Sequence, residues 1–182
     1  MSSNSPSWIA ALAAALIASA CSVPPQVQRP DPVAISNALA ETNSTVRFQH
    51  PARFTKALPG TLNTVFTSGL YVQSDSHVFL LSYWKESETF VKVFSIPMKD
   101  IDYFAVESTG MFNHLQQVQI FSHGFIYVAL LSNTPDAQAG SKEVTSAAVD
   151  SLLKAGVKQG QPHTRISPPF NGGVFIPIPV KK

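Results

Sequence analysis

Between residues 46 and 132 the chain alternates apolar and polar residues, or gathers apolar residues in short β-favouring runs. This pattern predicts strands, because successive side chains of a strand point to opposite faces of a sheet. Clusters of glycine, serine, aspartate and asparagine separate the runs at hairpin-sized intervals. We therefore predict about seven strands, at residues 62–67, 69–73, 77–84, 89–96, 101–107, 114–121 and 125–131.

Towards the C-terminus the hydrophobic period changes from alternation to helical spacing. Val144, Ala148 and Leu152 recur every four residues and predict one apolar stripe on a helix at residues 141–157. A serine at the start of this range is typical of a helix cap, and glycines mark its end. A shorter helix is predicted at residues 32–41, where an aspartate is followed by proline.

The strands are joined by hairpin-sized loops without a glycine-rich helix start between them, which predicts antiparallel sheets rather than parallel winding. Seven such strands followed by one amphipathic helix resemble the pleckstrin-homology-like (PH-like) fold. The sequence SIPMKDID at residues 95–102 resembles the mid-domain junction of bacterial PH-like and GRAM-like domains. The resemblance implies a mainly β domain over residues 46–160, an antiparallel seven-stranded PH-like barrel or sandwich with a C-terminal helix. Another small β-barrel or sandwich is the alternative.

An uncharged and almost wholly apolar run, WIAALAAALIASA, occupies residues 8–20. As a helix it would span about 20 Å, less than the bilayer core of about 30 Å, and its length is typical of a secretory signal peptide. The run ends in Ala-Ser-Ala directly before Cys21. This arrangement resembles the lipobox of bacterial lipoproteins, which implies that residues 1–20 are removed and that Cys21 is lipidated. An ordinary secretory leader with an incidental cysteine and an uncleaved anchor are the alternatives.

After Cys21 the composition changes at once to a polar, proline-rich stretch over residues 22–31. Such a stretch is semi-extended and predicts a tether between a membrane and a domain. The three acyl chains of a bacterial lipoprotein would anchor it stably, since two or more chains are sufficient. By the same resemblance, the serine after the cysteine implies the periplasmic face of the outer membrane. A soluble periplasmic or secreted protein is the alternative.

Composition and charge exclude several classes of function. Charged residues make up 13% of the chain and the net charge is +2, which excludes a strongly basic nucleic-acid-binding protein. One cysteine excludes an intrachain disulfide and a cysteine-based zinc site, and the five histidines lack metal-ligand spacing. Motifs for a serine nucleophile or a phosphate-binding loop are absent from the sequence. We therefore predict no catalytic residue, no metal, no cofactor and no enzymatic activity.

An aromatic-rich strand is the first feature that predicts binding. Phe79, Leu81 and Tyr83 share one face of the strand at residues 77–84, and Trp84 lies on the other face. Only one face of a barrel strand can belong to the core, so the other face is a candidate partner-binding patch. The alternative is that the N-terminal helix or the C-terminal tail covers it.

The C-terminal tail, residues 161–182, is the second such feature. It carries Phe175, Ile176 and Ile178 among prolines, which exclude a central strand. Because these apolar side chains are costly in water, the tail either packs on its own domain or docks on a partner as an edge segment.

Together these features predict a bacterial envelope lipoprotein that is tethered to the membrane by its lipid. Its β-domain is expected to act as a non-enzymatic binding or assembly module for an envelope protein partner. The alternative is a soluble periplasmic or secreted carrier that holds a small apolar ligand inside a β-barrel.

Overall fold

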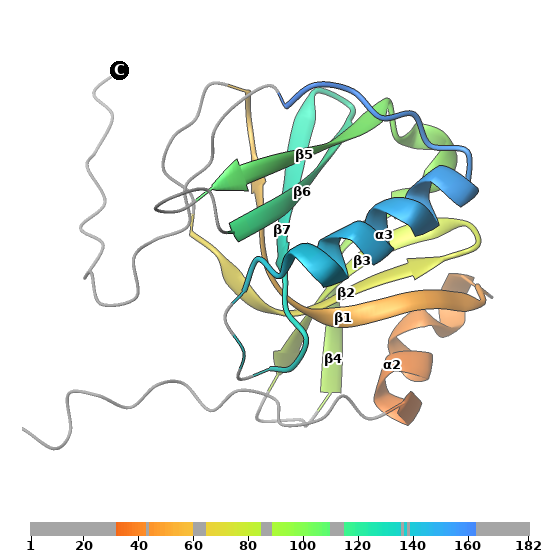
Figure 1. Cartoon of the computed structure of the whole chain (residues 1–182). Coiled ribbons are helices and arrows are strands. Elements are labelled where there is room, and N and C mark those ends of the chain that lie inside the picture. The colour runs from red at the N-terminus through yellow and green to blue at the C-terminus, as the bar shows by residue number, and fades with distance from the viewer. Residues whose placement is uncertain are drawn as a thin grey trace, which may run out of the picture.

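A computed structural model describes residues 32–42, 44–59, 65–84, 89–109, 115–135, 137 and 139–162. Within these residues seven strands form one antiparallel sheet, with one helix before it and one after it (Figure 1). The strands are β1 (Val46–Ala57), β2 (Thr67–Ser74), β3 (His77–Trp84), β4 (Thr89–Pro97), β5 (Tyr103–Thr109), β6 (Leu115–Ser122) and β7 (Phe125–Leu131). The helices are α2 (Pro32–Leu39) and α3 (Lys142–Lys154), with the 3-10 turns η1 (Ala40–Thr42) and η2 (Met98–Asp100). The predicted mainly β fold with seven antiparallel strands and a C-terminal helix is confirmed.

The strand order is β4-β3-β2-β1-β7-β6-β5, so the first strand of the chain lies at the centre of the sheet. β1 pairs with β2 along most of its length and with β7 from Ala52 onward, and it thereby joins two halves of the sheet. The sheet curls until the halves meet. The Phe94 ring on β4 lies 6.3 Å from the Phe54 ring on β1 and 5.3 Å from the Tyr127 ring on β7, measured between ring centres. The main core is enclosed between the two halves.

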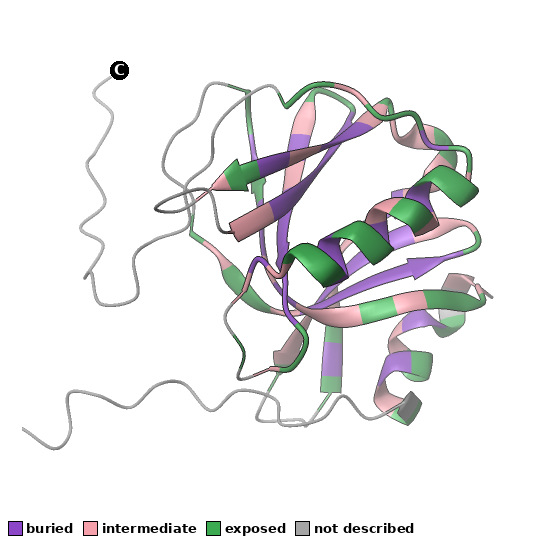
Figure 2. Cartoon of the chain, in the orientation of Figure 1, coloured by how far each residue is buried: buried purple, intermediate pink, exposed green. Residues whose placement is uncertain are grey.

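Helix α3 closes this core at one end. Its predicted stripe, Val144, Ala148 and Leu152, is buried, whereas its opposite side is exposed (Figure 2). The Ser141 side chain caps the helix by accepting a hydrogen bond from the Val144 amide at 3.4 Å. Gly156 ends the helix region with a φ of 83°, a conformation that glycine adopts without strain. The sequence therefore predicted both the ends and the buried stripe of this helix.

One strand of the sheet was not predicted, and one predicted strand fits the structure only at its end. Of the strand predicted at residues 62–67, Val65 and Phe66 belong to no strand, Thr67 begins β2, and residues 62–64 lie outside the described residues. The missing strand is β1, whose proline and charged residues hide its alternation. Its Pro51 carbonyl accepts a hydrogen bond from the Ser132 amide at 2.9 Å. The nitrogen of Pro51 points to the same side as this carbonyl, towards β7 and away from β2. Its missing N–H therefore costs no hydrogen bond in the β1–β2 ladder, and it lies just before the pairing with β7 begins.

The segment at residues 95–102 links the two halves, as the PH-like resemblance implied. β4 ends within it, η2 follows, and β5 begins directly after it. The Ser122 hydroxyl donates to the Asp100 carbonyl at 2.7 Å, and the Asp102 amide donates to the Phe121 carbonyl at 2.9 Å. These bonds hold the link against the end of β6.

Both outer faces of the sheet also bury apolar side chains. Helix α2 covers the outer face of β2, β3 and β4, in a cluster formed by Ile35, Leu39, Leu70, Val72, Phe79, Leu81 and Phe90. The outer face of β5, β6 and β7, with the end of β1, carries another cluster, formed by Ala57, Ala105, Phe121, Ile126 and Val128. The domain therefore has a central core and two flanking apolar layers.

Candidate functional site

The residues of β3 that were predicted to bind a partner differ in how far their side chains are exposed. Phe79 and Leu81 are fully buried beneath the apolar side of α2. Tyr83 is half-buried, and its ring packs edge-on against Phe90 with 5.3 Å between ring centres. At these positions the N-terminal helix covers the face, which was one of the alternatives that the sequence left open.

Exposed apolar surface lies at the hairpin end of β3 and β4. Trp84 is 57% exposed, Val91 43% and Val93 41%. Trp84 pairs with Thr89 and Ser82 pairs with Val91, so Trp84 and Val91 lie diagonally on one face of the hairpin. Diagonal neighbours are about 7–8 Å apart, which is within reach of an indole ring. We call Trp84, Val91 and Val93 the edge strip.

The edge strip flanks β4, the edge strand of the sheet that the structure describes. β4 is the first strand in the sheet order and, among the described strands, pairs with β3 alone. The pairing passes from Leu80 with Phe94 to Leu81 with Lys92, so Val93 forms a bulge. An edge strand presents a row of backbone donors and acceptors to which an extended segment of another protein can add. Apolar side chains beside such a row provide contacts that can fix the register of the added strand.

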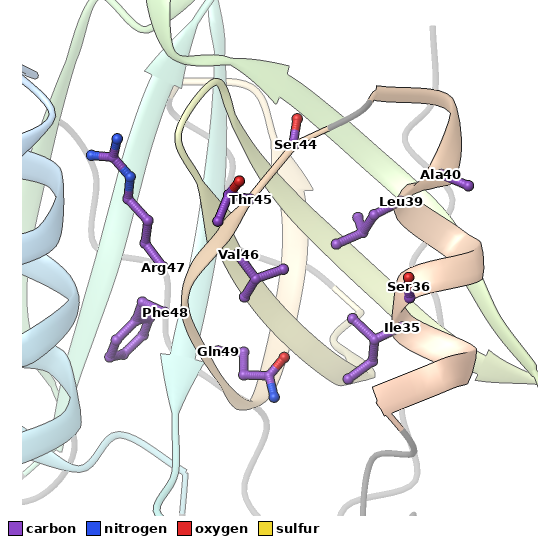
Figure 3. Close-up of a pocket in the computed structure, with 10 residues that line it drawn as sticks. All are labelled: Ile35, Ser36, Leu39, Ala40, Ser44, Thr45, Val46, Arg47, Phe48 and Gln49. Atoms are coloured by element: carbon purple, nitrogen blue, oxygen red, sulfur yellow. The ribbon is translucent and has the colours of Figure 1, made fainter.

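A groove lies between α2 and the start of β1. Its volume is about 590 Å³, and its lining residues are Ile35, Ser36, Leu39, Ala40, Ser44, Thr45, Val46, Arg47, Phe48 and Gln49. Figure 3 shows Ile35 and Leu39 pointing from α2 towards β1, whereas Phe48 points to the other side of the strand. Arg47 is the one charged side chain of this lining. The groove is open and largely polar, unlike the enclosed apolar pockets that hold small apolar ligands.

The space between the two halves of the sheet is filled by side chains, with Tyr71 and Gln73 at its centre. The Gln73 amide donates to the Tyr71 hydroxyl at 2.6 Å and to the Ala148 carbonyl of α3 at 3.0 Å, which ties the helix to the sheet. Burial raises the pKa of the Tyr71 phenol well above its ordinary value, and the hydrogen bond from Gln73 acts weakly in the opposite direction. Tyr71 is therefore neutral at physiological pH and acts as a packing residue.

The described histidines take part in structural hydrogen bonding. Nδ1 of His50, His77 and His123 each lies within hydrogen-bonding distance of a serine oxygen. In the described part of the chain, no three histidine, cysteine, aspartate or glutamate side chains are grouped as metal ligands. Helices in the same part are too short or too polar to cross a membrane.

Several predicted site residues, namely Cys21, Phe175, Ile176 and Ile178, lie outside the described residues, and their roles stay predictions. Conversely, Val91 and Val93 were not among the residues predicted to bind a partner. The signal was present, because apolar residues occupy both faces of the strand there. Its meaning depends on which strand forms the edge of the sheet, and local sequence does not determine that.

No known protein family and no curated protein matches the chain. Among solved structures, a DUF1696 family protein with a pleckstrin-homology domain from Shewanella loihica is similar at a TM-score of 0.39 and 12% identity, over 69% of this chain and 92% of that one. The Slm1 PH domain in complex with inositol-4-phosphate has a TM-score of 0.38 and 13% identity, over 61% and 96% of the two chains. Vav1 bound to an allosteric inhibitor has a TM-score of 0.44 and 9% identity, over 64% of this chain and 28% of that one. Such distant similarities carry nothing about ligands or activity over to this chain.

Proposed function

We propose that this chain is a bacterial envelope lipoprotein whose β-domain is a non-enzymatic binding and assembly module. In this proposal Cys21 carries the lipid, residues 22–31 form the tether, and the protein faces the periplasm from the outer membrane. The edge strip receives an envelope protein partner. The observation that carries the proposal is the edge strip itself, in which three exposed apolar side chains lie on or beside β4, the edge strand of the described sheet.

The position of α2 supports this arrangement. The proposed tether leads directly into α2, and α2 packs beside β4. In Figure 1 the start of α2 and the hairpin end of β3 and β4 both lie at the lower end of the domain. A proline-rich tether spans about 3.1 Å per residue, which amounts to about 30 Å over residues 22–31. The edge strip would thus be held close to the membrane surface, within reach of other envelope proteins.

The carrier function has weaker support. A carrier of a small apolar ligand needs an enclosed apolar cavity of several hundred Å³. The described interior is instead occupied by large buried side chains, namely Phe54, Tyr71, Leu80, Phe104, Ile120, Leu131 and Leu152. The groove beside α2 is open and carries Arg47 and several hydroxyl groups. These observations favour a surface that binds a protein over an interior that holds a ligand.

The lipid anchor is tested by the intact mass of the protein extracted from membranes with detergent. We expect the mass of residues 21–182 plus acyl chains, and we expect Cys21→Ser to move the protein into the soluble fraction. A bare mass, with cleavage near residue 20 and the protein in the soluble fraction, would contradict the anchor and return the carrier to first place.

The binding surface is tested by placing a photo-crosslinking amino acid at position 84, 91 or 93 of the full chain in cells. The control position is Leu153, which is 47% exposed on α3, away from the edge strip. We expect one envelope protein to be cross-linked from the strip and not from position 153, and the adduct to be lost from the Cys21→Ser protein. Equal products from all four positions, or none from the strip, would refute the assignment of the edge strip.

A further inference from the structure

The outer face of β5, β6 and β7 is buried, although both helices pack elsewhere. Val128, Gln117 and Gln119 on this face are 0% exposed. Helix α3 contributes to the central core and α2 to the layer over β3. Among the described apolar residues, Phe66 is the one outside the strands that packs on this face. A sheet face without a covering layer would expose every second side chain to water. A segment outside the described residues must therefore supply the cover.

We propose that the C-terminal segment, residues 163–182, docks on this face and that Arg165 pairs there with Glu107. This inference is independent of the lipid anchor and of the edge strip. It assigns the apolar tail to its own domain rather than to a partner.

The described chain leads directly to the face. Gln159 forms a parallel bridge with Phe104, and the Gly160 amide donates to the Phe104 carbonyl at 2.7 Å. A Cβ at Gly160 would lie 2.9 Å from Cε2 of Tyr103 and would overlap the ring, so glycine is needed for this close approach. Tyr103 in turn stacks on Phe121, a member of the buried face, with 4.1 Å between ring centres. The tail thus starts at the rim of the surface that needs a cover.

Direction and length also fit. Because the bridge is parallel, the chain leaves residue 160 running along β5 from Tyr103 towards Glu107. These two residues of β5 are about 13 Å apart, at about 3.3 Å per residue. The residues from 160 to 165 reach at most about 17 Å when extended. Arg165 can therefore arrive beside Glu107.

The chemistry of the two surfaces is complementary. Glu107 is 8% exposed, and its carboxylate accepts hydrogen bonds from the side-chain amides of Gln117 at 3.1 Å and Gln119 at 2.9 Å. A buried carboxylate is stabilised by a cation in direct contact, and arginine suits this role because it donates in two directions. Arg53, which stands on the same outer face, lies on β1, with β7 and β6 between it and β5. Arg165 is the one cation in the first half of the tail.

The rest of the tail matches the apolar part of the face. Its apolar side chains, Phe170, Val174, Phe175, Ile176, Ile178 and Val180, can cover Ala105, Phe121, Ile126 and Val128. Its prolines remove backbone donors, so the segment suits packing over a sheet better than pairing within one.

A charge-reversal series in the full chain tests the ion pair. We expect Arg165→Glu to lower the melting temperature by about 5 °C or more, and Glu107→Arg to lower it as well. The double variant with both changes should recover most of the loss. The matched control is Lys158→Glu, which reverses an exposed charge just before the bridge and should change little.

Thiol labelling tests docking without depending on that pair. In a Cys21→Ser background, we expect Phe175→Cys to react at least about tenfold more slowly than Gln161→Cys, because the first is covered and the second is exposed. Adding Arg165→Glu should speed labelling at position 175. If position 175 reacts as fast as position 161 and the charge reversals behave additively, the proposal is overturned and another segment or a second copy covers the face.

Discussion

Gly69 provides a sharp test of how tightly β2 and β3 are packed. Gly69 pairs with Ser82 in the β2–β3 ladder. A Cβ built on it would overlap the carbonyl oxygen of Leu81, and it would lie 2.9 Å from the carbonyl carbon of Leu81 and 3.1 Å from Cε1 of Phe54. Carbon atoms in favourable contact are about 3.5–4.0 Å apart. Gly69→Ala therefore forces the backbone of β3 away from β2.

The expected loss follows from what that movement breaks. Two ladder hydrogen bonds at about 1 kcal/mol each, together with overpacking of about 1–3 kcal/mol, give a loss of about 3 kcal/mol or more. The matched control is Gly124→Ala, where φ is 76° and no atom lies within 4 Å of the new Cβ. Its cost is the left-handed backbone conformation alone, about 1–2 kcal/mol. The effect of alanine on the unfolded chain is similar in both variants and cancels in the comparison.

The measurement is urea unfolding of the chain from residue 22 onward, followed by circular dichroism. We expect the midpoint of Gly69→Ala to fall well below that of Gly124→Ala, with equal denaturant slopes for the two variants. If Gly69→Ala is as stable as Gly124→Ala or more stable, the close approach of the two backbones, and with it the reasoning on the strand register, is wrong.

Three further predictions use the same unfolding assay. Leu39→Ala should cost about 2–3 kcal/mol because Leu39, the last residue of α2, is buried against the sheet. Val33→Ala, at 63% exposure on the same helix, should change stability by less than about 0.5 kcal/mol. Burial raises the pKa of the Tyr71 phenol above 10.0, so this phenol ionises first in the unfolded chain as the pH rises. The free energy of unfolding should therefore fall above that pH, by up to about 1.4 kcal/mol per pH unit. Tyr71→Phe should flatten this slope, and an unchanged slope would contradict the assignment. Gln73→Ala should cost about 2 kcal/mol, because it loses hydrogen bonds and side-chain volume. Gln73→Leu should cost less, because leucine fills the space and removes the buried Oε1, which has no hydrogen-bond partner. Equal losses for the two variants would show that side-chain volume is unimportant there.

The elements that sequence patterns predicted well are those whose signal is local. The stripe of α3 repeats at helical spacing and is bounded by a serine cap and a glycine, and each of these features acts within a few residues. The turn between β6 and β7 is similar, because His123 and Gly124 both adopt positive φ there. The junction between β4 and β5 was also placed correctly.

The elements that the sequence did not predict depend on distant partners. β1 was missed because Pro51 disfavours a central strand. It is tolerated here because its nitrogen points to the side of β7 just before the pairing with β7 begins, and local sequence does not determine where that pairing begins. Likewise, the apolar character of Phe79 and Leu81 does not show whether their side chains are exposed or covered. Their burial depends on α2, which lies far from them in the chain.

By itself, then, the sequence determined that the chain has a β-domain of antiparallel strands with a closing helix, and it supplied the leader and tether pattern from which an envelope location is proposed. Only the tertiary structure decided which of the described strands lies at the edge of the sheet, and thereby that Trp84, Val91 and Val93 are exposed beside it. The physical reason is that a strand's period fixes which side chains share a face, whereas water exposure is fixed by what packs on that face.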